Sequence, residues 1–234
     1  MTARTPPDLG TAVMIQRWRR VSFLHWPYPV SAVQPLLPPG LTVQSFDATA
    51  WVGIIPLLMD GVRPPGVPPV PWLSRFPETN LRTYVTGPDG RAGIFFLSVD
   101  AARLPAVLGA RASLGLPYHW STMSIHADAG TVRYRGLRRG GRAGYDLVLR
   151  PGSPIEAGPL DDFLTARYRL YSAHLGRCVA VDVTHRPWRL RSGTAVHLHE
   201  DLVIAAGLPA PNGAPLVHVA EPVKVRIGLP SVLT

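Results

Sequence analysis

The chain has 234 residues, of which 46% are hydrophobic and 17% charged, a composition typical of a folded globular domain and not of a disordered chain. No run approaches the roughly 18 apolar residues that cross a bilayer. In the N-terminal region the basic residues follow the short apolar stretch, which is the reverse of a signal peptide. The only cysteine, Cys178, excludes an internal disulfide. We therefore predict a soluble, cytoplasmic protein that does not contact membranes.

The formal net charge of +9 raises the question of nucleic-acid binding. Every basic residue except Lys224 is an arginine, which a coding bias explains more simply than a phosphate-binding surface. Residues 133–142 are the densest basic stretch, and their alternation around glycines predicts a solvated hairpin. No helix-turn-helix, RNA-recognition or zinc-finger pattern accompanies the charge. We do not expect nucleic acid as a partner, and we keep a basic protein that binds nucleic acid or an acidic partner as a third hypothesis.

Most of the chain is expected to form strands. Residues 50–59 are a nearly continuous apolar run, typical of a strand buried on both sides. Residues 80–101 predict a hairpin whose turn is Pro88-Asp89-Gly90. Between them, the proline-rich segment 64–71 predicts a surface loop. Further strands are expected at 121–128, 131–138, 144–152, 176–188, 190–200 and 223–229.

Three helices are expected. Residues 30–38 predict a short one, and residues 104–115 have alanine and leucine at helical spacing and end before Pro117. Residues 160–174 open with acidic residues, as a helix N-terminus favours. Their helical spacing places four side chains on one face: Leu164, Arg167, Tyr168 and Tyr171.

Many strands with a few helices favour an α+β fold that is mainly antiparallel β, built as a sheet or a barrel. No compositional break divides the chain, so we expect one domain over residues 17–234 after a flexible segment at residues 1–16. The sequence leaves the oligomeric state open, a homo-oligomer included.

The most informative strand is FPETNLRTYV, residues 76–85. Because side chains alternate across a strand, one face carries Glu78, Asn80, Arg82 and Tyr84. This row is either the outside of a surface strand or the lining of a cavity. In a cavity, Arg82 could grip a carboxylate ligand and Glu78 could exchange a proton. Close together, the two would keep one another charged.

Other candidates for a pocket are less distinctive. GLPYHW places Tyr118, His119 and Trp120 directly after a proline turn. His25, Arg167 and Tyr171 either reach a pocket or serve packing alone, and His185 has the same two readings. His197 and His199 share a strand face without a third ligand, so no metal site is predicted. No dinucleotide, P-loop or nucleophile-elbow motif is present, so we predict no cofactor.

The order of motifs resembles the YqjF-like family of uncharacterised conserved proteins, over roughly residues 17 to 230. The stretches that carry it are FLHWPYPVSAVQPLLPPGLTVQSFDATAWVGIIPL, FPETNLRTYV, GIFFLSVDA, ARASLGLPYHW, FLTARYRLY and THRPW. The family is similar to the acetoacetate decarboxylase-like superfamily. That resemblance implies a cone-shaped antiparallel barrel with a central cavity and a few flanking helices.

The same resemblance implies where chemistry sits. Acetoacetate decarboxylases use a lysine that forms a Schiff base and follows a Gly-aromatic-Pro turn, and Tyr118 stands at the corresponding position here. A phenol can donate a hydrogen bond or a proton but cannot form an imine. Lys224 is expected on the solvent face of a terminal strand. The cavity glutamate of the superfamily corresponds to Glu78.

We therefore hypothesise a barrel that binds a small molecule with a carboxylate or carbonyl group. Arg82 would anchor the anion, Glu78 would act as acid and base, and Tyr118 and His119 would donate protons. The remaining ligand-binding candidates are Asn80, Tyr84, His25, Trp120, Arg167 and Tyr171. Whether it is an enzyme stays open: a non-covalent lyase, isomerase or cyclase step competes with ligand binding or sensing alone.

Overall fold

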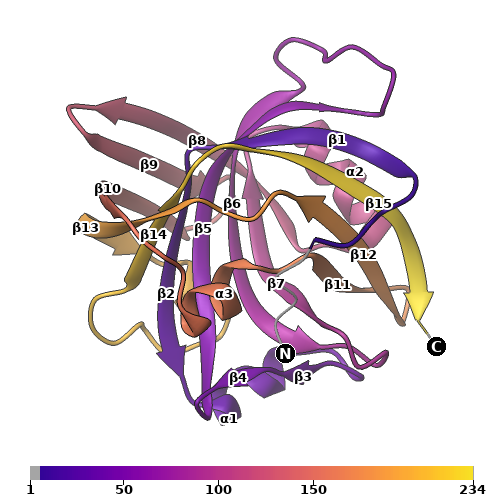
Figure 1. Cartoon of the computed structure of the whole chain (residues 1–234), viewed down its shortest axis with the longest axis horizontal. Helices are drawn as coiled ribbons and strands as arrows, with labels where there is room; N and C mark the ends of the chain where they lie inside the picture. The colour runs from indigo at the N-terminus through magenta and orange to yellow at the C-terminus, as the bar shows by residue number, and fades with distance from the viewer. Residues whose placement is uncertain (1–5, 234) are drawn as a thin grey trace.

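The strands join one mixed sheet that closes on itself (Figure 1). The computed structural model describes residues 6–233. The strands are β1 (Ala12–Arg19), β2 (Val21–Tyr28), β3 (Thr42–Val43), β4 (Ser45–Phe46), β5 (Thr49–Arg63), β6 (Arg75–Thr86), β7 (Ala92–Ala101), β8 (Tyr118–Asp128), β9 (Thr131–Arg138), β10 (Gly144–Pro154), β11 (Arg169–His174), β12 (Arg177–His185), β13 (Leu190–Glu200), β14 (Leu216–Ala220) and β15 (Val223–Leu233).

The sheet follows the order β1-β15-β12-β11-β7-β8-β9-β10-β13-β14-β2-β5-β6-β3, and β4 pairs with β5. Additional pairings of β1 with β5 and of β6 with β7 join strands that are distant in this order. Strands β1, β15, β12, β11, β7, β6 and β5 therefore form a closed ring. Strand β7 runs parallel to β8 and β11, and the other pairs are antiparallel. The predicted α+β class with a mainly antiparallel sheet is confirmed, and the sheet takes this ring-like form.

Strands β2, β5 and β6 have two buried faces. On β5, Ile55 and Leu57 belong to a core inside the ring, whereas Val52 and Ile54 belong to a second core. Strands β9 and β10 complete the second core, which includes Leu147. Burial on both faces is the reason why residues 50–59 read as an almost continuous apolar run.

Helix α2 (Leu104–Leu114) connects β7 to the parallel strand β8 and sets Tyr118 beside Val99. Gly115 ends this helix in the left-handed region, at φ 63°, which glycine adopts without a Cβ clash. The Nε of Arg111 then donates to the carbonyl oxygen of Tyr118 at 2.7 Å. The start of β8 is thus tied to the helix that delivers it.

The shorter helices are α1 (Val30–Val33), the 3-10 turn η1 (Gln34–Leu36), α3 (Pro159–Thr165) and α4 (Leu202–Ala205). Residues 160–174, predicted as one helix, are helical only to Thr165 and then form β11. Pairing of β11 with β12 and β7 overrides the helical spacing. Tyr171 helps to hold β11 in place, because its hydroxyl donates a hydrogen bond to Asp89 at 2.6 Å.

The proline-rich loop and the N-terminal segment can be compared with the predicted organisation of the chain. The proline-rich segment 64–71 is exposed, as predicted, and projects from the ring between β5 and β6 (Figure 1). Residues 12–16 fall in the predicted flexible segment but belong to β1, which pairs with β15 and β5. Residues 1–5 lie outside the described residues.

A buried ion pair joins β7 to β8 and β9. Arg138 donates through Nε and Nη2 to the two carboxyl oxygens of Asp100, at 2.9 and 3.0 Å. Ser121 donates to the same carboxylate at 2.6 Å. The side chains of Arg138 and Asp100 are only 11% and 2% exposed, so each charge depends on the other for compensation.

We expect Arg138→Leu to lower the free energy of unfolding by about 3–5 kcal/mol, because it leaves the Asp100 carboxylate buried without its cation. Urea unfolding followed by circular dichroism measures this loss. The matched control is Arg150→Leu, which removes an exposed arginine of β10 and should change stability by less than about 0.5 kcal/mol. Equal effects of the two substitutions would contradict the prediction.

Candidate functional site

A cavity of about 630 Å³ lies inside the closed ring. Its wall is mostly apolar, with side chains from β1, β2, β5, β6, β7, α2, β11, β12 and β15. The polar and charged groups in this wall are Gln16, Glu78, Asn80, Arg82, Ser113, Tyr118, Thr165, Arg167, Arg169 and His185. A mainly apolar cavity with a few polar groups is the usual form of a small-molecule site.

Glu78 and Tyr118 meet in this wall across β7. Glu78 on β6 lies opposite Ala101, and Tyr118 on β8 lies beside Val99 of the same strand. The small side chain of Ala101 leaves space between them. The hydroxyl of Tyr118 donates to Oε2 of Glu78 at 2.9 Å. The GLPYHW turn therefore brings its tyrosine to the glutamate of the polar strand.

Both groups of this pair hold their protons more strongly than usual. Burial raises the pKa of Glu78 from 4.5 to about 7, although the hydrogen bond from Tyr118 lowers it. Burial and the neighbouring Glu78 raise the pKa of the Tyr118 phenol well above its ordinary value. A carboxyl that titrates near neutral pH can both give and take a proton there, while the phenol serves as a hydrogen-bond donor.

Two arginines enter the cavity farther along β6 and just after α3. Nη2 of Arg82 donates to the carbonyl oxygen of Leu164 at 2.8 Å, and Nε of Arg167 donates to that of Phe163 at 2.6 Å. These carbonyls belong to the last turn of α3, the negative end of its dipole. Both guanidinium carbons also lie within 5.5 Å of the Tyr84 ring centroid. Nη1 of Arg167 also donates to Oε1 of Gln44 at 2.6 Å. Helix carbonyls, an amide oxygen and an aromatic ring hold the two cations, and no carboxylate of the described residues pairs with them.

The structure does not bring Glu78 and Arg82 together as the sequence suggested. Four residues along a strand correspond to about 13 Å, and no arginine contributes to the pKa of Glu78, which rises and does not fall. The expectation that the two side chains keep one another charged is therefore wrong. They are separate polar groups of one cavity.

Several polar atoms of the cavity wall are buried without a hydrogen-bond partner among the described residues. They are Gln16 Oε1, Trp18 Nε1, Asn80 Oδ1, Arg82 Nε and Arg167 Nη2. Leaving such groups unpaired is costly in a packed interior. Polar atoms that face a cavity can be paired by a ligand or by water.

Tyr84 and His25 lie behind the cavity wall. The Tyr84 hydroxyl donates to the carbonyl oxygen of Leu164 at 2.7 Å and lies 2.6 Å from Nε2 of His25. Burial, with Arg82 nearby, lowers the pKa of His25 well below its ordinary value. Neither residue lines the cavity, so Tyr84 acts on it through its contacts with Arg82 and Arg167, and His25 through its bond to Tyr84.

Other predicted site residues are placed elsewhere. His119 faces away from Tyr118, as alternation along β8 requires, and Trp120 is 38% exposed and lies under Arg139. Tyr171 belongs to the network of Asp89 and Arg169 beneath the hairpin turn. None of the three lines the cavity.

Sequence reasoning missed several residues of the wall. Gln16 and Trp18 come from β1, Thr165 ends α3 and Trp188 follows β12. His185, which the sequence left between a pocket and a packing role, also lines the cavity. In β1, Gln16 is buried between the half-buried Ile15 and the exposed Arg17. Its place on the same strand face as Trp18 was the one signal that could have identified it. Burial lowers the pKa of His185 to about 4, so this imidazole is neutral at neutral pH.

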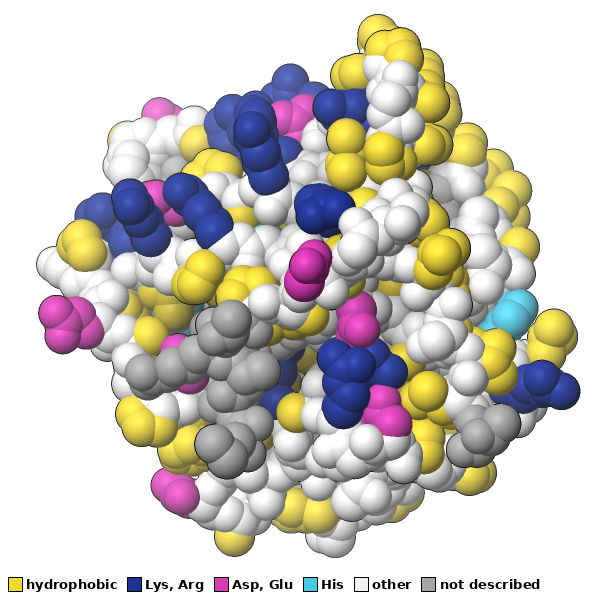
Figure 2. Space-filling model, turned by 45° about the vertical axis from the view of Figure 1, so that its right-hand side comes forward, with side chains coloured by type: hydrophobic (Ala, Val, Ile, Leu, Met, Phe, Trp, Pro, Cys, Tyr) yellow, Lys and Arg dark blue, Asp and Glu magenta, His cyan; other side chains and the backbone are white. Residues whose placement is uncertain are grey.

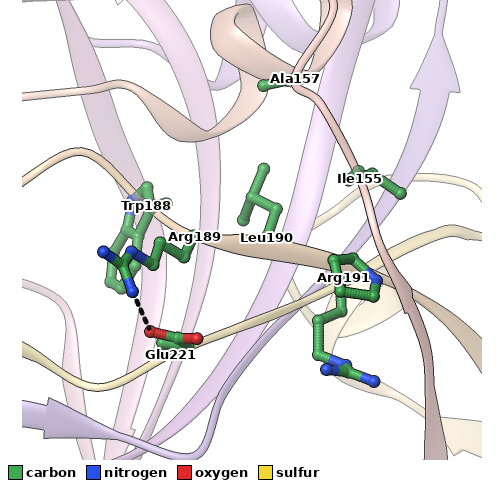
Figure 3. Close-up of a pocket in the computed structure, with 8 residues that line it drawn as sticks. Ile155, Ala157, Trp188, Arg189, Leu190, Arg191 and Glu221 are labelled. Atoms are coloured by element: carbon green, nitrogen blue, oxygen red, sulfur yellow. Dashed lines mark ion pairs between the residues drawn. The ribbon is translucent and has the colours of Figure 1, made fainter.

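A smaller pocket of about 320 Å³ lies on the surface side of Trp188 (Figure 3). Its charged groups are already paired in part, since Arg189 lies 3.8 Å from Glu221. Trp188 lines both spaces, and its indole N–H donates to the carbonyl oxygen of Thr165 at 3.0 Å. This tryptophan is therefore a fixed wall between the pocket and the cavity, and the cavity is the better candidate site.

Among residues 6–233, no three potential metal ligands cluster. No helix in this part of the chain is long and apolar enough to cross a membrane.

Residues 15–224 match DUF2071, a family described as "Uncharacterized conserved protein". The protein YqjF of Bacillus subtilis (strain 168) is 36% identical over 219 residues, which cover 92% of this chain and 90% of YqjF. The chain belongs to this family. The resemblance drawn from the sequence motifs to YqjF-like proteins is confirmed.

Solved structures place the DUF2071 chain among acetoacetate decarboxylase-like folds. Acetoacetate decarboxylase from Legionella pneumophila superposes with a TM-score of 0.69 at 12% identity, over 100% of this chain and 92% of that one. An acetoacetate decarboxylase-like enzyme from Sphingomonas wittichii RW1 gives 0.67 at 16%, over 98% and 96%. The enduracididine biosynthesis enzyme MppR, complexed with pyruvate, gives 0.67 at 14%, over 98% and 91%. At these low sequence identities, the structural similarity shows a shared fold and nothing more.

The raised pKa of Glu78 predicts a pH-dependent loss of stability. Between pH 4.5 and about 7 the unfolded carboxyl ionises while the folded one stays protonated, so folding becomes less favourable as the pH rises. The full loss is about 3 kcal/mol. Glutamine cannot ionise, and we expect the stability of Glu78→Gln relative to the wild type to increase by that amount between pH 4.5 and 8. Urea unfolding across this range measures it.

The matched control is Glu156→Gln, which changes an exposed carboxylate and should give a difference that hardly varies with pH. A flat difference for Glu78→Gln as well would mean that Glu78 titrates as an ordinary surface carboxylate.

Proposed function

We propose that this protein binds a small carbonyl or carboxylate compound in its central cavity and exchanges a proton with it through Glu78. The observation that carries the proposal is a buried carboxyl with a pKa of about 7, hydrogen-bonded by Tyr118 inside the cavity. Such pairs of titratable groups, shifted by burial, concentrate at catalytic sites. Structural relatives whose names describe enzymes, one of them with bound pyruvate, support a small-molecule site.

The chemistry would need no covalent bond to the protein. Ionised Glu78 takes a proton from the carbon beside a carbonyl group, the electron pair of that C–H bond moves toward the carbonyl oxygen, and an enolate forms. Returning the proton to carbon, at the same or another position, completes an exchange or an isomerisation. Tyr118 holds Oε2 of Glu78, which leaves Oε1 as the oxygen that exchanges the proton.

Schiff-base chemistry has no support in this cavity. Its lining contains no lysine, and Lys224, the only lysine of the chain, is exposed on β15. Tyr118 occupies the position that the resemblance to acetoacetate decarboxylases assigns to the reactive amine, and it is already hydrogen-bonded to Glu78.

A non-catalytic binding protein is the second candidate. The apolar character of most of the wall favours it, because burial of an apolar ligand supplies affinity without any proton transfer. The basic-surface hypothesis has less support. Basic side chains lie in separate groups on the face shown in Figure 2, several with acidic neighbours, and Arg133 and Arg135 both bind Asp146.

Deuterium exchange tests the proton-transfer proposal. We expect the wild type to exchange the protons beside the carbonyl of pyruvate or of methyl hexyl ketone in heavy water, with a rate that rises with pH through about 7. Glu78→Gln should lose at least about a hundredfold of this rate. Proton NMR measures the exchange.

Tyr118→Phe keeps the base but removes a hydrogen bond that lowers the pKa of Glu78, so it should move the midpoint of the pH profile upward. Exchange by Glu78→Gln at the wild-type rate would overturn the proton-transfer proposal. Ligand binding without exchange in any variant would establish the second candidate in its place.

Borohydride reduction tests the absence of an imine. With pyruvate and borohydride we expect no adduct on Lys224, because its side chain is exposed on β15 and cannot enter the cavity. Peptide mass spectrometry reports the modification. An adduct on Lys224 that forms rapidly at stoichiometric pyruvate would contradict the non-covalent scheme.

A further inference from the structure

Two of the three arginines that line the cavity have no acidic partner within the described residues. Among the lining residues, Arg169 is paired with Asp89 and Asp182, at 2.7 and 2.6 Å. Arg82 and Arg167 form no such pair, and both are 7% exposed. Burial and the repulsion of Arg82 lower the pKa of Arg167 to about 10, so it stays protonated at neutral pH. Two buried positive charges thus face a cavity in which Glu78 is the only acidic lining residue of the described part of the chain.

These arginines also keep unused donors. Nε of Arg82 and Nη2 of Arg167 have no partner within the described residues, while their other bonds to Leu164 and Phe163 fix the two guanidinium groups against α3. Because these donors are already held in place, the two side chains lose little conformational entropy when a ligand binds. Paired guanidinium donors suit a carboxylate, which accepts hydrogen bonds on both oxygens.

The wall around the two polar regions is mostly apolar, although Asn80 adds a polar side chain between them on β6. Ile55 of β5, opposite Asn80, lines this middle part, Met59 and Phe76 line the wall beyond Glu78, and Ile94 lines it beyond Arg82. The Cα atoms of Glu78 and Arg82 are about 13 Å apart along β6. A compact acid such as acetate or pyruvate is too short to occupy both regions, whereas a carboxylate with an extended chain spans them.

The exposed lining residues show where such a molecule enters. They come from β1, α2 and β15, and include Met14, Gly109, Ser113 and Pro230. Helix α2 leads into β8 at Tyr118, so the element that borders the open side also positions the Glu78–Tyr118 pair. The two unpaired arginines are anchored on a different element, α3.

We propose that the cavity takes a medium-chain monocarboxylic acid, with its carboxylate on Arg82 and Arg167 and its apolar chain directed toward Glu78 and Tyr118. This inference rests on the proposed function, because it identifies the ligand of the same cavity. It places the group that Glu78 would act on at the end of the chain remote from the carboxylate.

Tryptophan fluorescence provides the assay, since Trp18 and Trp188 line the cavity. The probes are butyrate, decanoate and decanol. We expect decanoate to bind at least a hundredfold more tightly than butyrate, because each buried methylene contributes about fourfold. Decanol, which lacks the charge, should bind at least about tenfold more weakly than decanoate.

The decisive variant is Arg167→Gln. It should weaken decanoate binding by at least about tenfold, because a hydrogen bond to a charged group is lost, and leave decanol binding within twofold, which also shows that the variant is folded. The control, Arg150→Gln on the surface of β10, should bind all three probes as the wild type does. Equal affinity for decanol and decanoate, or equal weakening of both by Arg167→Gln, would overturn the inference.

Failure of the inference and failure of the proposed function are distinguishable. Glu78→Gln should keep decanoate binding while it loses ketone exchange. No decanoate binding alongside exchange that depends on Glu78 would overturn the medium-chain acid alone. Decanoate binding that depends on Arg167, without any exchange, would remove proton transfer and leave the ligand class intact.

Discussion

Strand β6 has two buried faces, and the site depends on that constraint. Closure of the ring by the β6–β7 and β1–β5 pairings leaves no solvated side for this strand. Leu81 on one face packs into the core against β10, so Glu78, Asn80 and Arg82 on the other must enter the ring. Polar side chains in that position remain desolvated. The raised pKa of Glu78 and the unpaired donor of Arg82 are both consequences of this placement.

Arg82 and Glu78 differ in charge behaviour because their hydrogen-bond partners differ. A carboxylate beside Arg82 would have neutralised the guanidinium, but α3 supplies only the carbonyl oxygens of its last turn. Carbonyl groups orient a guanidinium without cancelling its net charge. Glu78, in contrast, receives a neutral phenol and keeps a proton near neutral pH. The cavity therefore combines a fixed positive region with a region that changes its protonation.

Sequence patterns within one strand correctly predicted several residues of the cavity wall. They failed where pairing with segments distant in the sequence determines the structure. Alternation on β6 identified Glu78, Asn80 and Arg82, and the proline turn identified Tyr118, all of which line the cavity. His119 was predicted beside Tyr118 because the strand was expected to begin at residue 121. It begins at Tyr118, and neighbouring residues on a strand face opposite ways. The segment 160–174 satisfied a helical spacing, yet β12 and the hairpin turn at Asp89 draw Tyr171 into a strand. Gln16 joins the wall only because β1 pairs with β5 and β15.

Tyr118 stands where the resemblance to acetoacetate decarboxylases implies a reactive amine, and a phenol at that position has different chemistry. An amine close to Glu78 would take up the proton of its carboxyl group and form an ion pair with it. Tyr118 cannot do so, because a pKa raised well above its ordinary value keeps the phenol neutral. The phenol donates one hydrogen bond and stays neutral, so Glu78 keeps the titration near neutral pH that proton transfer requires. The positive charge that would hold an anionic ligand must then come from elsewhere, and Arg82 and Arg167 supply it from another part of the cavity wall. Separation of these two roles along one strand favours a ligand longer than a simple keto acid.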